Sequence, residues 1–365
     1  MLKKKIVAVA MSGGVDSSLA AVLLQQQGFE VFGVTMKLWK HDDSAETSKG
    51  KQSRSPDKAI ESAKAVCEKH SMEHHVLDLS AQFRDKVVAN FIDEYKSGRT
   101  PNPCVVCNAV IKWNALYENI KGLGAECIAT GHYARIEYGR KYNRYELRKG
   151  LDQKRDQSYF LWGLKQDDLK RSIFPLGQIT KRRTRELAKQ FDIPTARAPE
   201  SREICFIPDD DYRKFMTDVA CTSSEPGDFL DENGKVVGQH KGVTMYTVGQ
   251  RKGLGVALGY PAYVRAIDVE KNVIHLGREE ALEATEFIIE NVNWVSVPKR
   301  VASITGQVKI RYSATPVEAT VTPRDDDTCL VKLGEAVKAI TPGQSAVIYS
   351  QDVVNAGGII ARVVK

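Results

Sequence analysis

The stretch KKIVAVAMSGGVDSSLAAVLLQQQG, residues 4–28, decides the fold. It opens with a short run of β-branched and small apolar residues, which is typical of a buried strand in a parallel sheet. It closes with Leu19, Val22 and Leu23 at helical spacing and with Gly28, a common helix stop signal. A strand followed at once by a helix predicts the first half of a βαβ unit.

The turn between this strand and helix, AMSGGVDSS at residues 10–18, has the composition of an anion site. Gly13 and Gly14 allow a tight turn, and the first N–H groups of the helix would face a bound anion. The Lys-Ser/Thr ending of a Walker A loop is missing. We therefore predict a phosphate loop of another kind. The alternative is a plain strand–turn–helix connection that binds no nucleotide.

The alternation of strands and helices continues to about residue 200. Strand patterns at 30–39 and 74–80 flank a helical pattern at 57–70. They predict an α/β domain with a parallel sheet covered on both faces. The polar residues 41–58 predict a mobile loop.

The pattern changes at about residue 206. We expect short strands and glycine-rich turns in 229–242 and 247–260, and strands that alternate apolar and polar residues from about residue 285. These features predict a small central α+β domain and a C-terminal β-barrel. The expected domains are 1–205, 206–280 and 281–365.

The composition is that of a soluble globular protein, with 42% hydrophobic and 27% charged residues in a chain of 365. A net charge of +7 permits a polyanionic partner without requiring one. The seven cysteines are an odd number and are scattered, which favours a reducing compartment. The apolar run 6–11 is too short for a signal peptide, and no run could span a membrane. We expect a cytoplasmic protein.

Cys104 and Cys107 form a C-x-x-C pair in PNPCVVCN, residues 101–108, which its two prolines predict to be a loop. Such a pair could be half of a zinc site, a redox pair or coincidence, and no second close pair completes a structural zinc site. Cys205, in PESREICFIPD near the domain junction, is either a buried structural residue or a functional thiol. The remaining cysteines are three expected core residues, Cys67, Cys127 and Cys329, and Cys221, which has no assignment.

Two basic stretches suit a nucleic-acid surface. Residues 138–162 interleave Arg and Lys with aromatic residues, which would supply cations for phosphates and rings for stacked bases. The alternative is a solvated hairpin with basic sides. Residues 181–190 form a basic helix pattern, which alone indicates a solvated face.

The loop SGGVDSS resembles the motif of the PP-loop ATP pyrophosphatases, which adenylate a substrate oxygen and release pyrophosphate. The ordered motifs SGGVDSS, NPCVVCNAVIKW, ATGHYARI, DQSYFL, ICFI and YTVGQRKGLG resemble the tRNA-specific 2-thiouridylases over nearly the whole chain. The resemblance implies an adenine nucleotide alpha hydrolase-like PP-loop domain and thiolation of the wobble uridine in tRNAs for Lys, Glu and Gln. It also implies ATP, Mg²⁺, a persulfide sulfur-donor protein, no membrane partner and a monomer. A PP-loop sulfurtransferase acting on another tRNA position is the alternative.

The resemblance carries roles onto matching residues. Cys107 matches the catalytic cysteine and Cys205 the cysteine that carries the persulfide. The matching ATP-binding positions are Ala10, Met11, Ser12, Gly13, Gly14, Val15, Asp16, Ser17, Met36 and Gly131. The matching tRNA-contacting positions are Asn102, Pro103, Cys104, His132, Arg155, Asp156, Gln157, Arg311, Tyr312 and Gln344, of which Asn102 to Cys104 would touch the target base.

The implied chemistry explains the thiols. Adenylation turns the uridine C2 oxygen into a good leaving group, AMP. Sulfur then attacks C2, either from a Cys205 persulfide that Cys107 releases or as sulfide freed by Cys107. Both routes need a thiolate, so depressed cysteine pKa values are expected.

Cys104 stands where better-known members of the family have Asp. Two readings remain open. Cys104 is a spectator or backup thiol, or Cys104, Cys107 and Cys205 together hold an iron–sulfur cluster (4Fe–4S) whose open iron binds sulfide.

Overall fold

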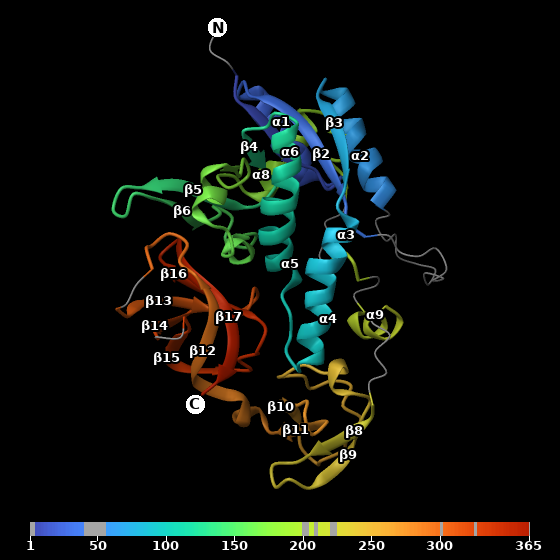
Figure 1. Ribbon diagram of the computed structural model, residues 1–365, viewed down its shortest axis with the longest axis vertical. Helices are drawn as coiled ribbons and strands as arrows, with labels where there is room; N and C mark the ends of the chain where they lie inside the picture. The colour runs from blue at the N-terminus through green and yellow to red at the C-terminus, as the bar shows by residue number, and fades with distance from the viewer. Residues whose placement is uncertain are drawn as a thin grey trace.

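The computed structural model describes residues 4–39, 56–198, 204–207, 211–219, 225–299, 302–324 and 327–364. The expected mobile loop at 41–58 lies outside these ranges up to residue 55, and its last residues belong to a helix instead. Cys221 also lies outside them. Figure 1 shows the α/β domain at the top, the C-terminal barrel below it, and the small central sheet beside the lower end of α4.

The first domain is built on a five-stranded parallel sheet in the order β3-β2-β1-β4-β7. The strands are β1 (Ile6–Ala10), β2 (Glu30–Lys37), β3 (Glu73–Asp78), β4 (Cys127–Ala129) and β7 (Ser172–Ile173). Helices α1 (Val15–Gln26), α2 (Pro56–Lys69) and α8 (Lys181–Gln190) belong to this domain. Separate apolar clusters form around the inner strands, as expected for a sheet buried on both faces. The predicted α/β class is confirmed.

Two nearly continuous helices connect β3 to β4. The first runs through α3 (Ser80–Phe83), the π-helix η1 (Arg84–Val88) and α4 (Ala89–Lys96). The second runs through α5 (Pro103–Val106), the π-helix η2 (Cys107–Leu116) and α6 (Tyr117–Gly122). The loop predicted for the C-x-x-C pair is therefore wrong. Pro103 begins the helix, a position where the missing N–H costs no hydrogen bond and the fixed φ is favourable.

The central domain is a four-stranded sheet in the order β10-β11-β8-β9. Its strands are β8 (Gly227–Leu230), β9 (Val236–His240), β10 (Tyr263–Asp268) and β11 (Val273–Gly277). Helix α9 (Tyr212–Asp218) precedes it and stacks Tyr212 on Tyr95 of α4, with ring centroids 4.7 Å apart. The strands expected in 247–260 do not form. Four glycines there adopt positive φ, which breaks an extended strand into turns.

The C-terminal domain is a closed six-stranded barrel in the order β12-β15-β14-β13-β16-β17, and pairing of β17 with β12 closes it. The strands are β12 (Glu283–Asn293), β13 (Ile304–Lys309), β14 (Val317–Pro323), β15 (Cys329–Lys338), β16 (Ser345–Ser350) and β17 (Val353–Val363). The predicted barrel is confirmed. Short helices elsewhere are η3 (Ser158–Leu161), α7 (Gln166–Lys170), η5 (Val243–Met245) and η6 (Glu279–Leu282).

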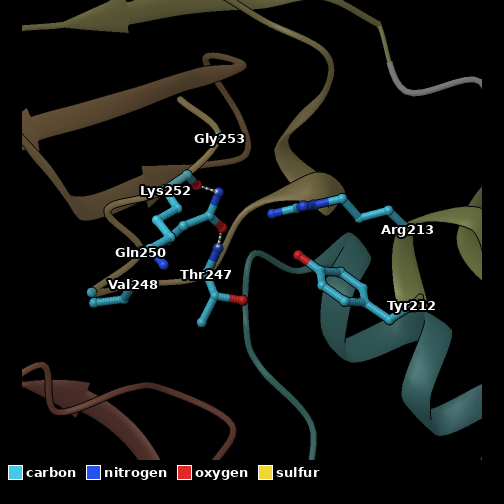
Figure 2. A pocket seen from close by; sticks show the side chains of 8 residues that line it. Tyr212, Arg213, Thr247, Val248, Gln250, Lys252 and Gly253 are labelled. Atoms are coloured by element: carbon cyan, nitrogen blue, oxygen red, sulfur yellow. Dashed lines mark hydrogen bonds between the residues drawn. The ribbon is translucent and has the colours of Figure 1, made fainter. Parts of the chain in front are cut away.

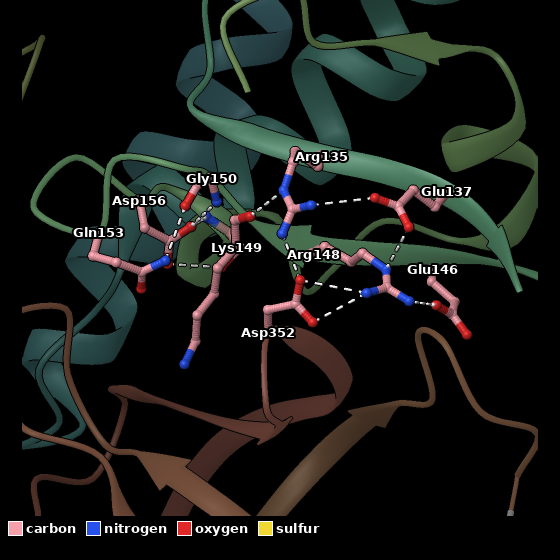
Figure 3. Close-up of polar contacts among 10 residues, drawn as sticks. Arg135, Glu137, Glu146, Arg148, Lys149, Gly150, Gln153, Asp156 and Asp352 are labelled. Atoms are coloured by element: carbon pink, nitrogen blue, oxygen red, sulfur yellow. Dashed lines mark hydrogen bonds and ion pairs between the residues drawn. The ribbon is translucent and has the colours of Figure 1, made fainter. Parts of the chain in front are cut away.

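A hairpin of the first domain extends the barrel sheet. It consists of β5 (Ala134–Gly139) and β6 (Arg144–Lys149), and β6 pairs with β17 at Arg148 and Val353. Figure 3 shows that the carboxylate of Asp352 accepts hydrogen bonds from the guanidinium groups of Arg135 and Arg148. The basic sides of this hairpin are thus partly used to hold the two domains together.

Replacing Asp352 by alanine should weaken this junction. Partial burial opposes ionisation of Asp352, but Arg148 and Arg135 hold its pKa below the usual range. The stabilisation is present above the unfolded pKa of ~3.9 and is lost as pH falls through the lower folded value. We expect D352A to lower the free energy of hairpin opening by about 1–3 kcal/mol at pH 7. Hydrogen exchange of the Lys149 amide, which donates to the Asp352 carbonyl at 2.7 Å, measures it. An equal D352A effect below pH 3 would contradict the electrostatic account.

Candidate functional site

The predicted phosphate loop connects β1 to α1. Gly14 is the N-cap of α1, and Gly13 has a φ of 68°. A Cβ on Gly13 would lie 2.7 Å from the carbonyl oxygen of Ala59, so only glycine fits there. The Ser12 N–H donates to Ser17 Oγ at 3.1 Å. The loop is therefore closed on itself and leaves the start of α1 directed at any bound anion.

Gly131 lies against the same loop. A Cβ on Gly131 would be 2.7 Å from both the carbonyl carbon of Asp16 and the backbone nitrogen of Ser17. Gly131 follows β4, and the sheet order changes direction between β1 and β4. Ligands of open α/β sheets bind at such a switch point. The structure thus brings Gly131 and the loop together, as a shared nucleotide site requires.

The other predicted nucleotide-binding positions are buried or half-buried residues near this loop. Met11 is buried, and its sulfur lies 3.4 Å from Cys67 Sγ. Ala10 and Val15 are buried too, while Met36 is half-buried at the end of β2. The predicted burial of Cys67, Cys127 and Cys329 is confirmed.

Asp16 is fixed by residues that sequence reasoning missed. Lys181 Nζ lies 2.7 Å from both carboxylate oxygens of Asp16. The Tyr133 hydroxyl donates to Asp16 Oδ1 at 2.9 Å and also lies 2.9 Å from Thr184 Oγ1. Lys181 belongs to the basic helix pattern 181–190, for which the sequence alone predicts a solvated face and the family resemblance a tRNA-binding one. Its partner on the loop could not be seen without the fold.

The three candidate cysteines come together. Cys104 lies on α5, Cys107 begins η2, and Cys205 approaches from the segment 204–207. The charges of Cys107 and Cys104 both act on the Cys205 thiol, which places the three as neighbours. Cys107 is buried, whereas Cys104 and Cys205 are exposed.

The buried structural reading of Cys205 is wrong. Its neighbours Phe206 and Ile207 occupy the core positions instead. The Phe206 ring contacts Phe83 and Phe91 edge-on, with centroids 5.5 and 5.4 Å apart. These apolar contacts anchor the segment and leave the Cys205 thiol at the surface.

The expected depressed cysteine pKa values are also wrong. Burial raises the pKa of Cys107 to about 11 and that of Cys205 to about 12, and it raises the pKa of Cys104. Although Cys104 and Cys205 reach solvent, protein atoms surround their thiols and remove hydration that a thiolate needs. The charge of Lys112 opposes all three shifts without overcoming them.

Lys112 is a second residue that sequence reasoning missed. It lies inside the quoted motif NPCVVCNAVIKW, five residues after Cys107. In a π-helix hydrogen bonds join residues five apart, so the two side chains lie on one face of η2. Lys112 Nζ donates to Asn108 Oδ1 at 2.8 Å, and Asn108 Nδ2 donates to the Phe160 carbonyl at 3.0 Å. The helix type thus positions the cation beside the thiols.

His132 lies near the same lysine. Its Nδ1 pairs with Thr130 Oγ1 at 2.5 Å, and its ring lies against Trp113 and Phe174, with centroids 6.0 and 5.9 Å away. Burial, assisted by the Lys112 charge, lowers the His132 pKa well below the usual value. His132 is therefore neutral at pH 7 and can offer a hydrogen bond but not a charge.

Most of the predicted tRNA positions meet where the first domain contacts the barrel. Asn102 shares a side-chain hydrogen bond with Tyr159. The exposed Tyr312 ring lies 4.6 Å from the Phe160 ring, and the Arg155 charge acts on Tyr312. Pro103 is buried, Arg311 donates to the carbonyl of Lys338, and Gln344 contacts the segment before Asn102. These positions form one surface, which we call the junction surface.

Asp156 and Gln157 differ from the others. Asp156 is 5% exposed and accepts hydrogen bonds from the N–H groups of Gly150 and Ser158 and from the Ser158 hydroxyl. Gln157 Oε1 accepts from the Tyr133 N–H at 3.0 Å. Both side chains hold the loop that carries Arg155, so they shape the junction surface from within.

Comparison with known proteins supports one family. Family models described as tRNA methyl transferase HUP domain, tRNA methyl transferase PRC-barrel domain and Aminomethyltransferase beta-barrel domain match residues 5–209, 213–278 and 284–360. The tRNA-specific 2-thiouridylase MnmA 2 of Thermoanaerobacter sp. (strain X514) is 47% identical over 359 residues, covering 98% of each chain. The tRNA-specific 2-thiouridylase MnmA of Clostridioides difficile (strain 630) is 43% identical and covers 99% of each chain.

The chain belongs to the tRNA-specific 2-thiouridylase family. The predicted family is confirmed, and with it a nucleotide-binding PP-loop domain in a transferase. The match spans all three parts of the structure, so the thiol site and the junction surface lie in regions shared with these relatives. No helix in the described part of the chain is long and apolar enough to cross a membrane.

The iron–sulfur reading of this 2-thiouridylase family member finds no geometric support. Among the described residues, no group of three or more His, Cys, Asp or Glu side chains could hold a metal ion. Cys104, Cys107 and Cys205 are neighbours without forming such a group.

An open pocket of about 490 Å³ lies away from the predicted residues of the family (Figure 2). It separates the start of α9, at Tyr212 and Arg213, from the glycine-rich loop 247–253. None of its lining residues is among the predicted site residues. The motif YTVGQRKGLG thus helps to form this pocket.

Proposed function

We propose that this chain is a tRNA uridine 2-sulfurtransferase that thiolates the wobble uridine. The observation that carries the proposal is the meeting of Cys107 and Cys205, from segments about a hundred residues apart, in a domain with a PP-loop. The family models are described as methyl transferase domains, whereas the curated relatives are 2-thiouridylases. Neighbouring thiols favour the transfer of sulfur, because a methyl transfer to RNA has no need for a thiol pair.

The phosphate loop supplies the activation step. The first N–H groups of α1 would hold the ATP phosphates, and Gly131 allows the nucleotide to approach the loop backbone. Mg²⁺ would neutralise the phosphate charge when bound, while Asp16 keeps its contacts with Lys181 and Tyr133. The C2 oxygen of uridine attacks the α-phosphate, pyrophosphate leaves, and the C2 position becomes an adenylate. The junction surface would bind the anticodon arm with the uridine turned out of its stack.

The two thiols supply the sulfur step. The terminal sulfur of a Cys205 persulfide attacks C2, and AMP leaves with the former C2 oxygen. The Cys107 thiolate then attacks Cys205 Sγ, which releases the 2-thiouridine and leaves a Cys107–Cys205 disulfide. A thiol reductant must reduce that disulfide before another turn. A persulfide is a stronger acid than a thiol, so the raised pKa of the Cys205 thiol does not prevent this attack.

The raised pKa of Cys107 predicts a steep pH dependence. At a pKa of about 11, the thiolate fraction is small at pH 7 and grows tenfold for each pH unit. We expect the rate of Cys107 alkylation by iodoacetamide in the free protein to rise about tenfold per unit from pH 7 to 10. Mass spectrometry of the modified peptide measures that rate.

The Lys112→Met variant tests whether the Lys112 charge lowers the pKa of Cys107. Because the Lys112 charge lowers the Cys107 pKa, its removal should raise that pKa further and slow alkylation at pH 9. Lys121, at the exposed end of α6, provides the matched control K121M. A rate that levels off below pH 9 would contradict the burial of the Cys107 thiol.

The finer assignments belong to the same proposal. We propose that the substrates are tRNAs for Lys, Glu and Gln, that a persulfide sulfur-donor protein loads Cys205, and that the protein acts as a cytoplasmic monomer. The proposed domain boundaries are 1–205, 206–280 and 281–365.

Thiolation of unmodified tRNA tests the function. The anaerobically purified protein is given ATP, Mg²⁺ and sulfide, or a persulfide donor, and its iron is counted in the same sample. Sulfur at the wobble uridine with equal AMP and pyrophosphate supports the proposal. Sulfur at another nucleotide would select the alternative sulfurtransferase. Full activity without iron excludes an iron–sulfur cluster. Activity that rises in proportion to bound iron would support the cluster hypothesis.

A further inference from the structure

The segment 99–103 enters the helix that carries the cysteines. It follows α4 and rises between α4 and the barrel to the start of α5 (Figure 1). Cys104 is the next residue, so any shift of this segment moves the thiol site. The loop 339–344 of the barrel, between β15 and β16, lies against it.

Gln344 contacts this segment through its side-chain amide. Gln344 Nε2 donates to the carbonyls of Thr100 and Pro101, each at 3.0 Å. Both partners are acceptors, so the amide nitrogen and not the oxygen must face them. Both N–H bonds of Gln344 are therefore used within the protein. They hold the two peptide groups that precede Asn102 and the first turn of α5.

Three neighbouring contacts also hold the segment 99–103 against the barrel. The Thr100 N–H donates to the Pro342 carbonyl at 2.8 Å. Gly343 packs so closely that a Cβ would lie 2.7 Å from the Thr100 carbonyl oxygen. Arg99 pairs with Glu290 of β12 at 2.7 Å. The barrel thus holds the segment through its backbone as well as through one ion pair.

The loop that carries Gln344 is itself fixed to the barrel. The Gly343 N–H donates to the Ile360 carbonyl of β17, and the Ile360 N–H donates to the Gln344 carbonyl, both at 2.8 Å. The Ser345 carbonyl accepts from the Tyr159 hydroxyl at 3.0 Å. Gln344 therefore connects a rigid strand to the start of the cysteine helix.

We propose that Gln344 is a positioning residue for Cys104 and Cys107, in addition to any contact with tRNA. The family resemblance assigns it only to tRNA. The structure shows that both of its donors are engaged within the protein. Loss of the side-chain amide leaves two carbonyls without these donors and loosens the entry to α5. The inference concerns the free protein, so it does not depend on the proposed reaction.

The test is the reactivity of Cys107 in the full-length protein without ATP or tRNA. We expect Gln344→Leu to raise the iodoacetamide alkylation rate of the buried Cys107 about tenfold, because two lost hydrogen bonds shift local opening on that scale. Hydrogen exchange of the Val105 amide, in the first turn of α5, should accelerate with it. Gln239→Leu, at an exposed strand position, is the matched control and should change neither rate.

A second variant keeps the proposal falsifiable if Gln344→Leu folds poorly. Gly343→Ala leaves Gln344 in place but pushes against Thr100, so it should change Cys107 reactivity in the same experiment. If Gln344→Leu raises only the KM for tRNA while alkylation and exchange in the free protein stay as in wild type, the positioning role is overturned. A failure of thiolation itself would leave these free-protein rates unaffected.

Discussion

Replacing Cys107 by serine is expected to abolish sulfur transfer, with a loss of about a thousandfold or more. A serine hydroxyl cannot attack the Cys205 sulfur to release the thiolated product, so the reaction would stop with the uridine still joined to Cys205 through the transferred sulfur. Cys205→Ser should cause an equal loss, because no persulfide can form. Quantified 2-thiouridine in digested tRNA measures both.

Three comparisons sharpen this result. ATP-dependent pyrophosphate release should persist in both variants, since the phosphate loop is separate in sequence. Cys104→Ser should stay active if Cys104 is a spectator, and should fail with the others if all three thiols are required. Cys329→Ala, in the barrel core, controls for loss of a thiol as such. Wild-type thiolation by either Cys107→Ser or Cys205→Ser would remove the thiol-pair mechanism.

Replacing Gly131 by alanine should weaken the binding of ATP. The added methyl group would lie 2.7 Å from the backbone of Asp16 and Ser17 at the start of α1, and backbone atoms cannot move aside as a flexible side chain can. Overpacking of this kind costs about 1–3 kcal/mol, so ATP affinity should fall by about 5- to 150-fold. Isothermal titration with a non-hydrolysable ATP analogue measures it.

Gly122→Ala is the matched control for that variant. No atom lies within 4 Å of the methyl group that it would add at the end of α6, so ATP affinity should not change. Cys107 alkylation in Gly131→Ala should also stay at the wild-type rate. If Gly131→Ala binds the analogue normally, the contact between β4 and the loop has no part in nucleotide binding.

The fold could be predicted wherever local pattern and tertiary packing agree. Residues 4–28 have a strand pattern and a helical pattern with a glycine turn between them, and they form β1, the loop and α1. The barrel strands follow their alternation in the same way. The loop prediction for 101–108 is wrong, because a proline pair signals a turn unless one of the prolines begins a helix, as Pro103 does. The glycines of 247–260 turn the chain too often for the strands expected there.

The site was only partly predictable, for a different reason. The sequence motifs indicate Cys107, Cys205 and Gly131 as candidates. Burial, however, is a property of the assembled core, so the direction of the thiol pKa shifts could not be predicted from the sequence. Lys112 reaches Cys107 through a π-helical turn, and sequence periodicity assumes the α-helical one. Lys181 meets Asp16 across 165 positions of sequence. Such partners are found only when the chain has folded.

The junction between β6 and β17 has a consequence for synthesis on the ribosome. Arg148 of the hairpin pairs with Val353, about 200 residues later in the chain. At ~5–20 residues per second, the hairpin is made about 10–40 s before its partner strand emerges. During that interval β6 presents an unpaired edge, the feature that promotes aggregation of nascent chains. The first domain of this protein is thus translated first but completed last.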